Sequence, residues 1–443
     1  MEKLALLGGT PAVIGAPEEK LFKWPIITEE DEAAALDVIR NNSYSGTDIT
    51  EKFQDEFAAW IGRAHAVAFC NGTMSLAASM FAIGLEAGDE IICPTKTYWA
   101  SITGATQFGA SPVFCNINDM LSMDPADIEH RITPRTKALM VVHLYGYPCD
   151  MDAIMEIANR HNLYVIEDVS HAQGGLYKGK RLGTFGHIGA MSLMSGKSFA
   201  AGELGIIVTD DKKLCERAIA YGHYERNNEK YITENKGLTA YYGIPLGGVK
   251  GRANQLCSAL ARVQLKYYDE RMTELRRAMN YFWDCLGNVP GLQAIRVDES
   301  TGSNMGGWYQ PHGRYYPEYF GGLSVGRFCE AVRAEIGNMC WEGGNFCLHT
   351  HEYFKSFDFL GRGKPSRIAF NDTDVREGDS DLNKSVEKLC FSVPWFKHCD
   401  EESKVWIEKY AAAYRKVAEN YEQLLENDKN NAPGGRWFGA ENE

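Results

Sequence analysis

The chain has 443 residues, of which 44% are hydrophobic and 24% are charged, and its formal net charge at pH 7 is -13. A chain of this length exceeds one ordinary hydrophobic core, so we expect one large and one smaller domain. The acidic balance disfavours nucleic acid and anionic membranes as partners, because both select basic surfaces. The composition therefore favours a protein that acts on small molecules.

The twelve cysteines and the first residues of the chain indicate its compartment. The cysteines include no CxxC pair, and several lie in apolar runs, as is typical of reduced thiols. Gly8, Gly9, Pro11 and Pro17 interrupt the start of the chain, so we expect neither a signal peptide nor a membrane span. We predict a cytoplasmic protein.

The predicted elements begin after an N-terminal arm. Thr28, followed by Asp31 three positions later, has the pattern of a capping box and predicts a helix that runs through Ile39. Helical and strand-like runs then alternate. The next predicted elements are a helix at 73–85, strands at 90–94, 111–116 and 137–144, a helix at 151–161 and a strand at 163–168. This rhythm predicts an α/β fold with a mostly parallel sheet between two layers of helices.

A long helix is predicted at 260–286, because apolar residues recur along one side of it. A helix of this length suits a bridge between two domains, and we place the domain boundary near residue 275. The predicted organisation is an arm at 1–27, a large domain at 28–275, a smaller C-terminal α+β domain at 276–426 and a loosely ordered tail at 427–443.

Two residues of the predicted large domain have the chemistry of a pyridoxal 5'-phosphate site. Asp168 ends an apolar run of the kind that buried parallel strands show, and ligands of open α/β sheets bind beyond the carboxyl ends of strands. A lysine amine such as that of Lys197 can form a Schiff base with the cofactor aldehyde, and a carboxylate can keep the pyridine nitrogen protonated. Alone, such a pair is more often a solvated lysine and a helix cap.

Further motifs follow one another in order along most of the chain. They are the segment 4–12, Phe69-Cys-Asn-Gly-Thr73, Cys93-Pro-Thr-Lys-Thr-Tyr98, Val142-His-Leu-Tyr-Gly146, Val165-Ile-Glu-Asp-Val-Ser-His171, and the segments 200–209 and 319–330. This series resembles the DegT/DnrJ/EryC1/StrS family of sugar and cyclitol aminotransferases, over about residues 1–425. The segments 4–12 and 319–330 resemble the branch that acts on inososes. The resemblance implies the type I fold of the pyridoxal phosphate enzymes.

The resemblance also implies roles for the residues around the cofactor. Lys197 and Asp168 match the catalytic pair, and His171 matches the family position beside the cofactor hydroxyl. Tyr98 matches the aromatic residue that stacks on the pyridine ring. Trp99 comes one position later and would point the opposite way if the segment is extended.

The cofactor phosphate is predicted to bind at the start of a helix. Gly72 and Thr73 precede the predicted helix, and free backbone amides at a helix N-terminus bind phosphate. Ser192 matches the family serine that donates a hydroxyl to the same phosphate. Lys250 lies in a segment that resembles the loop reaching into the neighbouring subunit's site, where many members place an asparagine on the phosphate. Arg252 of that loop could bind the carboxylate of the amino donor.

His349 and His351 are predicted to line the sugar pocket, because imidazoles can hydrogen-bond to hydroxyls. Cys340 and Cys347 lie near them in sequence, and the four side chains could in principle ligate zinc. No CxxC or HxxxH spacing supports a closed tetrahedral site, so we predict no metal.

The resemblance implies an aminotransferase that moves an amino group from glutamate or glutamine to a keto-sugar or keto-cyclitol by ping-pong kinetics, in a homodimer with shared active sites. Two alternatives are a sugar dehydratase of the same fold and a non-catalytic regulator that binds the cofactor. Lys197 counts against the dehydratase, in which a histidine replaces the lysine. The intact set of Lys197, Asp168 and Ser192 counts against the regulator. The acceptor, the donor and the regiochemistry stay open.

Overall fold

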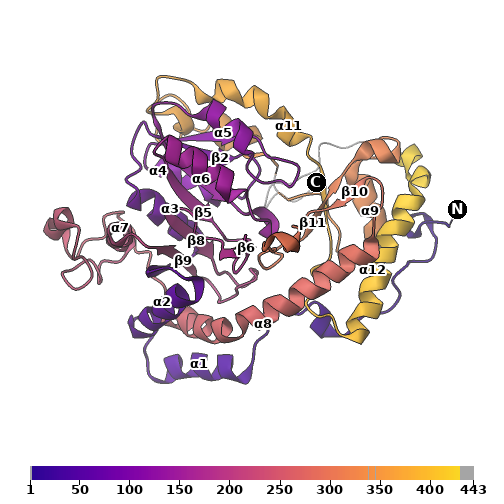
Figure 1. Cartoon of the computed structure of the whole chain (residues 1–443), viewed down its shortest axis with the longest axis horizontal. Coiled ribbons are helices and arrows are strands. Elements are labelled where there is room, and N and C mark those ends of the chain that lie inside the picture. The colour runs from indigo at the N-terminus through magenta and orange to yellow at the C-terminus, as the bar shows by residue number, and fades with distance from the viewer. Residues whose placement is uncertain (1, 338, 345, 430–443) are drawn as a thin grey trace.

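The computed structural model describes residues 2–337, 339–344 and 346–429, and a seven-stranded sheet forms the centre of its larger domain (Figure 1). The strand order is β1-β9-β8-β5-β4-β2-β3. The strands are β1 (His65–Phe69), β2 (Glu90–Pro94), β3 (Ser111–Cys115), β4 (Thr136–Val142), β5 (Tyr164–Asp168), β8 (Ile188–Ser192) and β9 (Gly205–Thr209). All pairs from β3 to β8 are parallel, whereas β9 is antiparallel to both neighbours. The predicted α/β class and mostly parallel sheet are confirmed.

Helices cover both faces of this sheet because successive strand residues point to opposite sides. In β4, for example, Met140 packs in one apolar cluster with helices α3, α4 and α7, and its neighbours Leu139 and Val141 pack in another with α5 and α6. A third cluster joins α2 and part of α8 to β8 and β9. The helices are α2 (Asp48–Ile61), α3 (Gly72–Ala82), α4 (Ala100–Gln107), α5 (Pro125–Arg131), α6 (Met151–Arg160) and α7 (Lys212–Gly222).

The first and the longest helices confirm two expectations from the sequence. Helix α1 (Glu29–Arg40) begins with the predicted capping box of Thr28 and Asp31. Helix α8 (Gln255–Leu286) is one continuous helix of 32 residues that starts beside α1 and α2 and ends in the smaller domain (Figure 1). It passes through residue 275 without a break, and Leu275 already packs in the core of the smaller domain.

The smaller domain consists of a three-stranded antiparallel sheet with helices. The elements are β10 (Leu292–Ala294), β11 (His312–Tyr315), β12 (Cys390–Ser392), α9 (Val325–Ile336) and α12 (Glu401–Glu419). Residues 421–427 form a short 3-10 helix, and residues 430–443 of the predicted tail lie outside the described residues. Throughout the described part of the chain, each helix is too short or too polar to cross a membrane.

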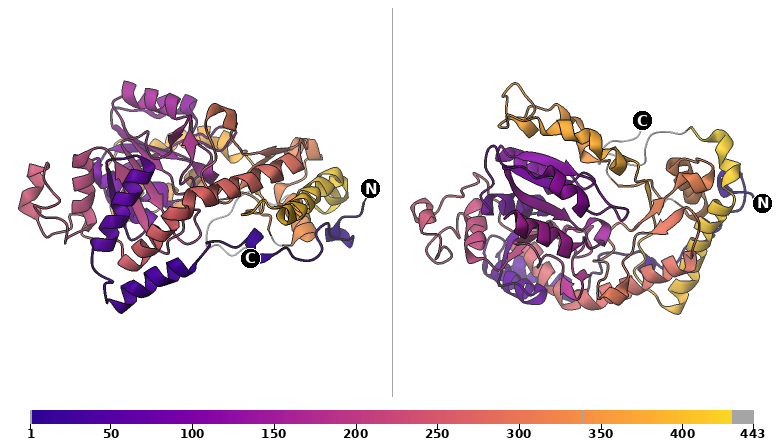
Figure 2. Two further views of the ribbon diagram at one scale, coloured as in Figure 1. Left: turned by 60° about the horizontal axis from the view of Figure 1, so that its bottom comes forward. Right: turned by 45° about the horizontal axis from the view of Figure 1, so that its top comes forward.

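One segment of the predicted small domain leaves it and returns to the large sheet. Between β11 and β12, residues 348–388, which include α10 (Glu352–Lys355) and α11 (Asn383–Val386), lie over the edge strand β3 (Figure 2). Arg367 donates to the carbonyl of Pro112 over 2.7 Å, so the segment is bonded to the strand backbone. Covering an edge strand in this way removes a site where another chain could pair.

The N-terminal arm is bound to the smaller domain by one buried carboxylate. Glu335 of α9 is fully buried and accepts hydrogen bonds from the amides of Ala5 and Ala12, each over 2.8 Å. The ammonium of Lys416 on α12 lies 3.0 Å from the same carboxylate. The arm therefore depends on an ion pair that is itself shielded from water.

We predict that Glu335→Ala lowers the free energy of unfolding by about 3 kcal/mol, because Lys416 and two arm amides lose their buried partner. Urea denaturation followed by tryptophan fluorescence measures the change. Glu330→Ala on the same helix is the matched control, since the Glu330 side chain is 45% exposed and its ion pair with Arg327 should contribute less than about 1 kcal/mol. Equal losses in the two variants would contradict this role of Glu335.

Candidate active site

Residues predicted from different parts of the sequence meet at one edge of the sheet. Asp168 ends β5 and Ser192 ends β8, and these strands are parallel neighbours. Tyr98 follows β2, which is parallel to β4 in the same sheet. Because parallel strands end at one edge, the sheet brings these side chains to a common site.

Lys197 lies in the turn that follows β8, and it is buried. Its side chain is only 9% exposed, and its ammonium lies 4.0 Å from the centre of the Tyr309 ring. The indole of Trp24 donates to the carbonyl of Lys197 over 2.9 Å, which holds the turn from the side of the N-terminal arm. Burial lowers the pKa of Lys197 to about 8, although the negative charge of Asp168 acts in the opposite direction. A neutral amine is therefore accessible near physiological pH, as a nucleophile requires.

Hydrogen bonds hold both oxygens of the Asp168 carboxylate. Oδ2 accepts from the hydroxyl of Ser101 over 2.8 Å, and Oδ1 accepts from the amide of Ser170 over 3.0 Å. Thr97 in turn lies 3.0 Å from the Ser101 hydroxyl. Ser101 belongs to α4 and Ser170 follows β5, so these two segments set the orientation of the buried carboxylate.

The start of α3 forms the predicted seat for an anion. Asn71 caps the helix by accepting from the amide of Met74 over 2.8 Å, and the amides of Gly72 and Thr73 donate to no other residue that the structure describes. A Cβ placed on Gly72 would lie 2.5 Å from Cβ of Ser192. Only glycine allows this approach, and so Gly72, Thr73 and Ser192 lie together where a phosphate would bind.

The two aromatic residues after β2 differ in exposure. Tyr98 is half-buried, whereas Trp99 is 41% exposed. The backbone of Trp99, at the N-cap of α4, is already helical, with a φ of -55° and a ψ of -31°. The assumption of an extended segment was therefore wrong, and the two rings lie 4.8 Å apart instead of on opposite sides.

His171 is part of a row of rings beside Lys197. Its ring centre lies 4.5 Å from that of Tyr309 and 6.0 Å from that of Tyr145, and its Nδ1 accepts from the Tyr145 amide over 3.4 Å. Tyr145 in turn stacks on His312 at 3.9 Å. Burial, together with the charge of Lys197, lowers the pKa of His171 well below its usual range. The imidazole is therefore neutral.

Several residues of this site were not predicted. Tyr309 and Trp24 come from segments without a periodic pattern, and Ser101 is an ordinary helix residue by its sequence. Tyr145 could have been found, because it lies in one of the ordered motifs, and its positive φ of 56° marks a backbone held in an unfavourable conformation.

Lys250 and Arg252 flank Gly251, whose carbonyl accepts from the amide of Cys70 over 2.7 Å. Lys250 is exposed, and its ammonium lies 5.0 Å from the ring of Tyr224. Arg252 pairs with Glu225 at 3.2 Å. The loop before them extends away from the body of the molecule after α7 (Figure 1). Their predicted contacts with a neighbouring subunit and with the donor stay predictions.

His349 and His351 belong to the segment that covers β3. Nδ1 of His349 lies 2.5 Å from the hydroxyl of Thr95, and burial lowers the pKa of His349 to about 4. His351 caps α10 by accepting from the amide of Tyr353 over 3.0 Å. These contacts hold the segment in place, and the predicted role in the sugar pocket stays a prediction. Across the residues that the structure describes, no three His, Cys, Asp or Glu side chains are grouped to hold a metal ion.

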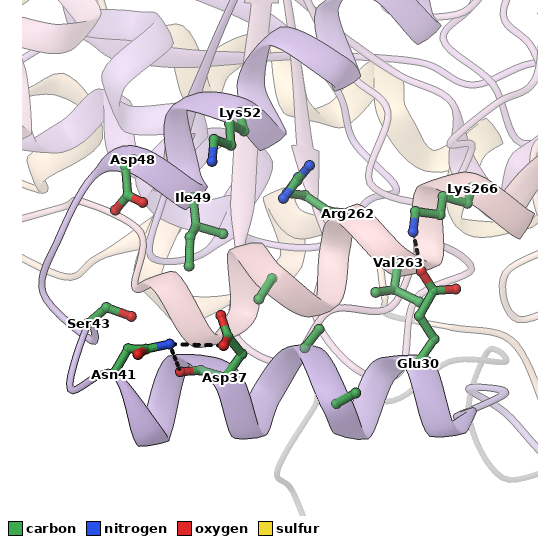
Figure 3. A pocket seen from close by; sticks show the side chains of 13 residues that line it. Glu30, Asp37, Asn41, Ser43, Asp48, Ile49, Lys52, Arg262, Val263 and Lys266 are labelled. Carbon is green, nitrogen blue, oxygen red and sulfur yellow. Dashed lines mark hydrogen bonds and ion pairs between the residues drawn. The ribbon is translucent and has the colours of Figure 1, made fainter.

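A pocket of about 570 Å³ lies elsewhere, between α1, α2 and α8 (Figure 3). Its charged side chains are of both signs, and Lys266 pairs with Glu30 across it. None of the predicted site residues lines this pocket. The positive and negative side chains of this pocket balance one another, so we propose no catalytic or binding function for it.

Comparison with known proteins agrees with this geometry. Residues 25–315 match the model of the DegT/DnrJ/EryC1/StrS aminotransferase family. A GDP-perosamine synthase of Escherichia coli O157:H7 is 37% identical over 52% of this chain, and the match spans 61% of that relative's length. A putative L-glutamine:3-amino-2,3-dideoxy-scyllo-inosose aminotransferase of Micromonospora echinospora is 30% identical over 80% of this chain and 82% of its own length.

The fold agrees with the same comparison. The X-ray structure of an aminotransferase from Psychrobacter cryohalolentis superposes on this chain with a TM-score of 0.73 at 25% sequence identity. The superposition covers 91% of this chain and 100% of the aminotransferase chain. Members of the matched family depend on pyridoxal phosphate, and the anion seat, Asp168 and the buried Lys197 suit that cofactor. Sequence, fold and site therefore agree that this chain belongs to the DegT/DnrJ/EryC1/StrS aminotransferase family.

Proposed function

We propose that this protein is a pyridoxal-phosphate-dependent aminotransferase that moves an amino group from glutamate or glutamine to a keto-sugar or keto-cyclitol. The observation that carries the proposal is the buried amine of Lys197, with a pKa of about 8, in the turn after β8, the strand next to the one that ends in Asp168. Pyridoxal phosphate supplies an electron sink when it is bound. The residues of the chain then bind it, orient it and move protons.

Each residue of the site has a role that follows from its position. Gly72, Thr73 and Ser192 would bind the phosphate, and Asp168 would keep the pyridine nitrogen protonated. Lys197 would hold the cofactor and, when free, would accept and return the proton of the donor carbon. Tyr98 would pack on the ring, and His171 would offer a neutral hydrogen-bonding group to the cofactor hydroxyl. Because one substrate leaves before the next binds, the kinetics are ping-pong.

The acceptor class is supported by the aromatic side chains next to Lys197. The ring of Tyr309 lies 6.0 Å from that of Trp395, which lies 5.9 Å from that of Trp24. Flat apolar faces of this kind suit the C–H faces of a sugar or cyclitol ring. Relatives named for GDP-perosamine and for an amino-scyllo-inosose support the same class. Lys250 would complete the site of a second subunit in a homodimer.

The direct test is the visible absorption spectrum of the protein after incubation with pyridoxal phosphate. We expect a yellow band that glutamate or glutamine bleaches, and no such band in Lys197→Ala, because only that amine reaches the cofactor. Lys178→Ala, which removes an exposed lysine, is the control and should keep the band. A protein that stays colourless would overturn the proposal, and a band that no donor bleaches would indicate a binding protein without turnover.

The lowered pKa of Lys197 predicts how cofactor capture depends on pH. Below pH 8 the amine is protonated and cannot attack, so the rate of capture by the unloaded protein should rise about fiftyfold from pH 6 to pH 8. Above pH 9 it should level off. An ordinary exposed lysine, with its pKa near 10.5, would instead keep gaining about tenfold per pH unit to pH 10. Stopped-flow absorbance measures the rate, with Lys197→Ala as the blank.

We predict that Gly72→Ala raises the dissociation constant for pyridoxal phosphate about tenfold or more, because the added methyl pushes α3 away from Ser192. Equilibrium titration of the unloaded protein measures it. Gly326→Ala in α9 is the matched control, since a Cβ there meets nothing within 4 Å. If both variants bind pyridoxal phosphate as tightly as the parent protein does, the start of α3 is not the phosphate site.

A further inference from the structure

Gln173, in the loop after β5, is a completely buried polar side chain with partners on two sides. Its amide nitrogen donates to the carbonyl of Ser192 over 2.6 Å and to that of Ser170 over 3.0 Å. On the other side, its amide oxygen accepts from the hydroxyl of Ser198 over 2.7 Å. This one side chain therefore joins the loop after β5, the end of β8 and the turn of Lys197.

A tyrosine of α8 completes the network around Gln173. Tyr268 is only 2% exposed and donates to the backbone carbonyl of Gln173 over 2.9 Å. Its hydroxyl oxygen lies 3.1 Å from that of Ser198, which is 1% exposed. Each donor of the three side chains has an acceptor, so the network fixes the positions of its members. Removal of one member leaves a buried polar group without its partner.

This network connects the two residues of the predicted catalytic pair. Ser198 follows Lys197 directly in the chain, so the hydrogen bond from Ser198 to Gln173 holds the turn of the lysine. Ser170 accepts from the amide of Ser192 over 2.9 Å with its hydroxyl, and its own amide donates to the carboxylate of Asp168. Gln173 therefore links the turn of Lys197 to the loop that orients Asp168.

The loop of the smaller domain that carries Tyr309 packs on the same network. A Cβ placed on Gly307 would lie 2.1 Å from the hydroxyl oxygen of Ser198, and Gly307 adopts a φ of 63°. Glycine allows both the close approach and this conformation. The position of Ser198 therefore also affects where Tyr309 lies over Lys197.

We propose that Gln173 is a positioning residue, which holds Lys197 in the place relative to Asp168 that the reaction needs. The inference rests on the proposed function for the role of Lys197. A displacement of about 1 Å from the productive geometry can lower the rate of a reaction about a hundredfold, so a reactive lysine in a turn needs such support. A glutamine with a structural role alone would stabilise the fold and leave the amine of Lys197 unaffected.

The test measures the amine of Lys197 itself, after hydroxylamine has removed any bound cofactor. Acetic anhydride acylates only neutral amines, so the rate of acetylation of Lys197, followed by peptide mass spectrometry, rises with pH around a midpoint at the pKa of that amine. We expect a midpoint at about pH 8 in the parent protein. In Gln173→Met it should lie about one pH unit higher, because the loosened turn lets water reach the amine. Asp168, His171 and Tyr309 also face this amine, and every variant retains them.

Three further variants test the link between Gln173 and the turn. Ser198→Ala removes that link alone and should shift the midpoint in the same direction. Gln173→His should retain part of the parent behaviour, because an imidazole can donate with one nitrogen and accept with the other. The matched control is Gln255→Met at the start of α8. Gln255 is also completely buried, and it donates to the carbonyl of Ser43 and accepts from the amide of Ile49, each over 2.7 Å. This control should keep the midpoint of the parent protein.

Thermal melting separates an effect on folding from an effect on the amine. Gln173→Met and Gln255→Met should both melt below the parent protein, because each leaves buried polar groups unpaired. An equal shift of the midpoint in these two variants, or an unchanged midpoint in folded Gln173→Met, would overturn the inference. If Gln173→Met does not fold, an unchanged midpoint in Ser198→Ala overturns it instead.

Incubation with pyridoxal phosphate distinguishes this inference from the proposed function. If the parent protein stays colourless but the midpoint of Lys197 depends on Gln173, the hold on Lys197 stands and the aminotransferase fails. If the yellow band forms and a donor bleaches it but the midpoint does not depend on Gln173, the aminotransferase stands and the role of Gln173 fails.

Discussion

Removing an amine from water lowers its affinity for a proton, and the site around Lys197 depends on this effect. Its pKa falls to about 8 even though Asp168 opposes the shift. Three parts of the chain exclude water from this one side chain. The sheet supplies the turn that carries Lys197, the smaller domain supplies Tyr309, and the N-terminal arm supplies Trp24. Both domains and the arm therefore contribute to the environment that lowers the pKa of Lys197.

The attachment of the N-terminal arm matters to the active site because the arm carries Trp24. Glu335 accepts hydrogen bonds from Ala5 and Ala12 and pairs with Lys416, all in the smaller domain or the arm. Trp24 lies further along the arm and donates to the turn of Lys197. Between these two points Leu21 is buried in the core of the smaller domain and Phe22 packs against Phe396, so contacts along the whole arm hold that indole in place. The structural ion pair and the reactive lysine are therefore parts of one arrangement.

The regular elements could be predicted from the sequence because their signals are local. Apolar runs placed β2 at its observed bounds and β3, β4 and β5 within two residues of theirs, whereas β1, β8 and β9 were not predicted with bounds. Helix α8 begins five residues before its predicted start, where Asn254 caps it by accepting from the amide of Cys257. That cap could have been read from the sequence. So could the end of α3 at Ala82, three residues early, because Gly84 after it adopts a φ of 75° and the amide of Leu85 donates to the carbonyl of Met80.

The site was only partly predictable. Lys197, Asp168, Gly72 and Ser192 lie at or just beyond strand and helix ends, and the family resemblance predicted them as site residues. Trp24 and Tyr309 reach the site through the packing of the arm and the smaller domain, which no local pattern encodes. The return of residues 348–388 to β3 was missed for the same reason. Its contacts join residues far apart in sequence, such as Arg367 and Pro112.

The contact of residues 348–388 with β3 affects how the two domains can move relative to each other. The smaller domain is connected to the sheet at two separate places, by the unbroken helix α8 at one and by the segment 348–388 at the other (Figure 2). A body held by a single hinge can swing in many directions, whereas a body held at two points rotates about the line that joins them. Displacement of the smaller domain would therefore have to bend α8 and shift the segment 348–388 together, and this resists any movement of Tyr309 away from Lys197.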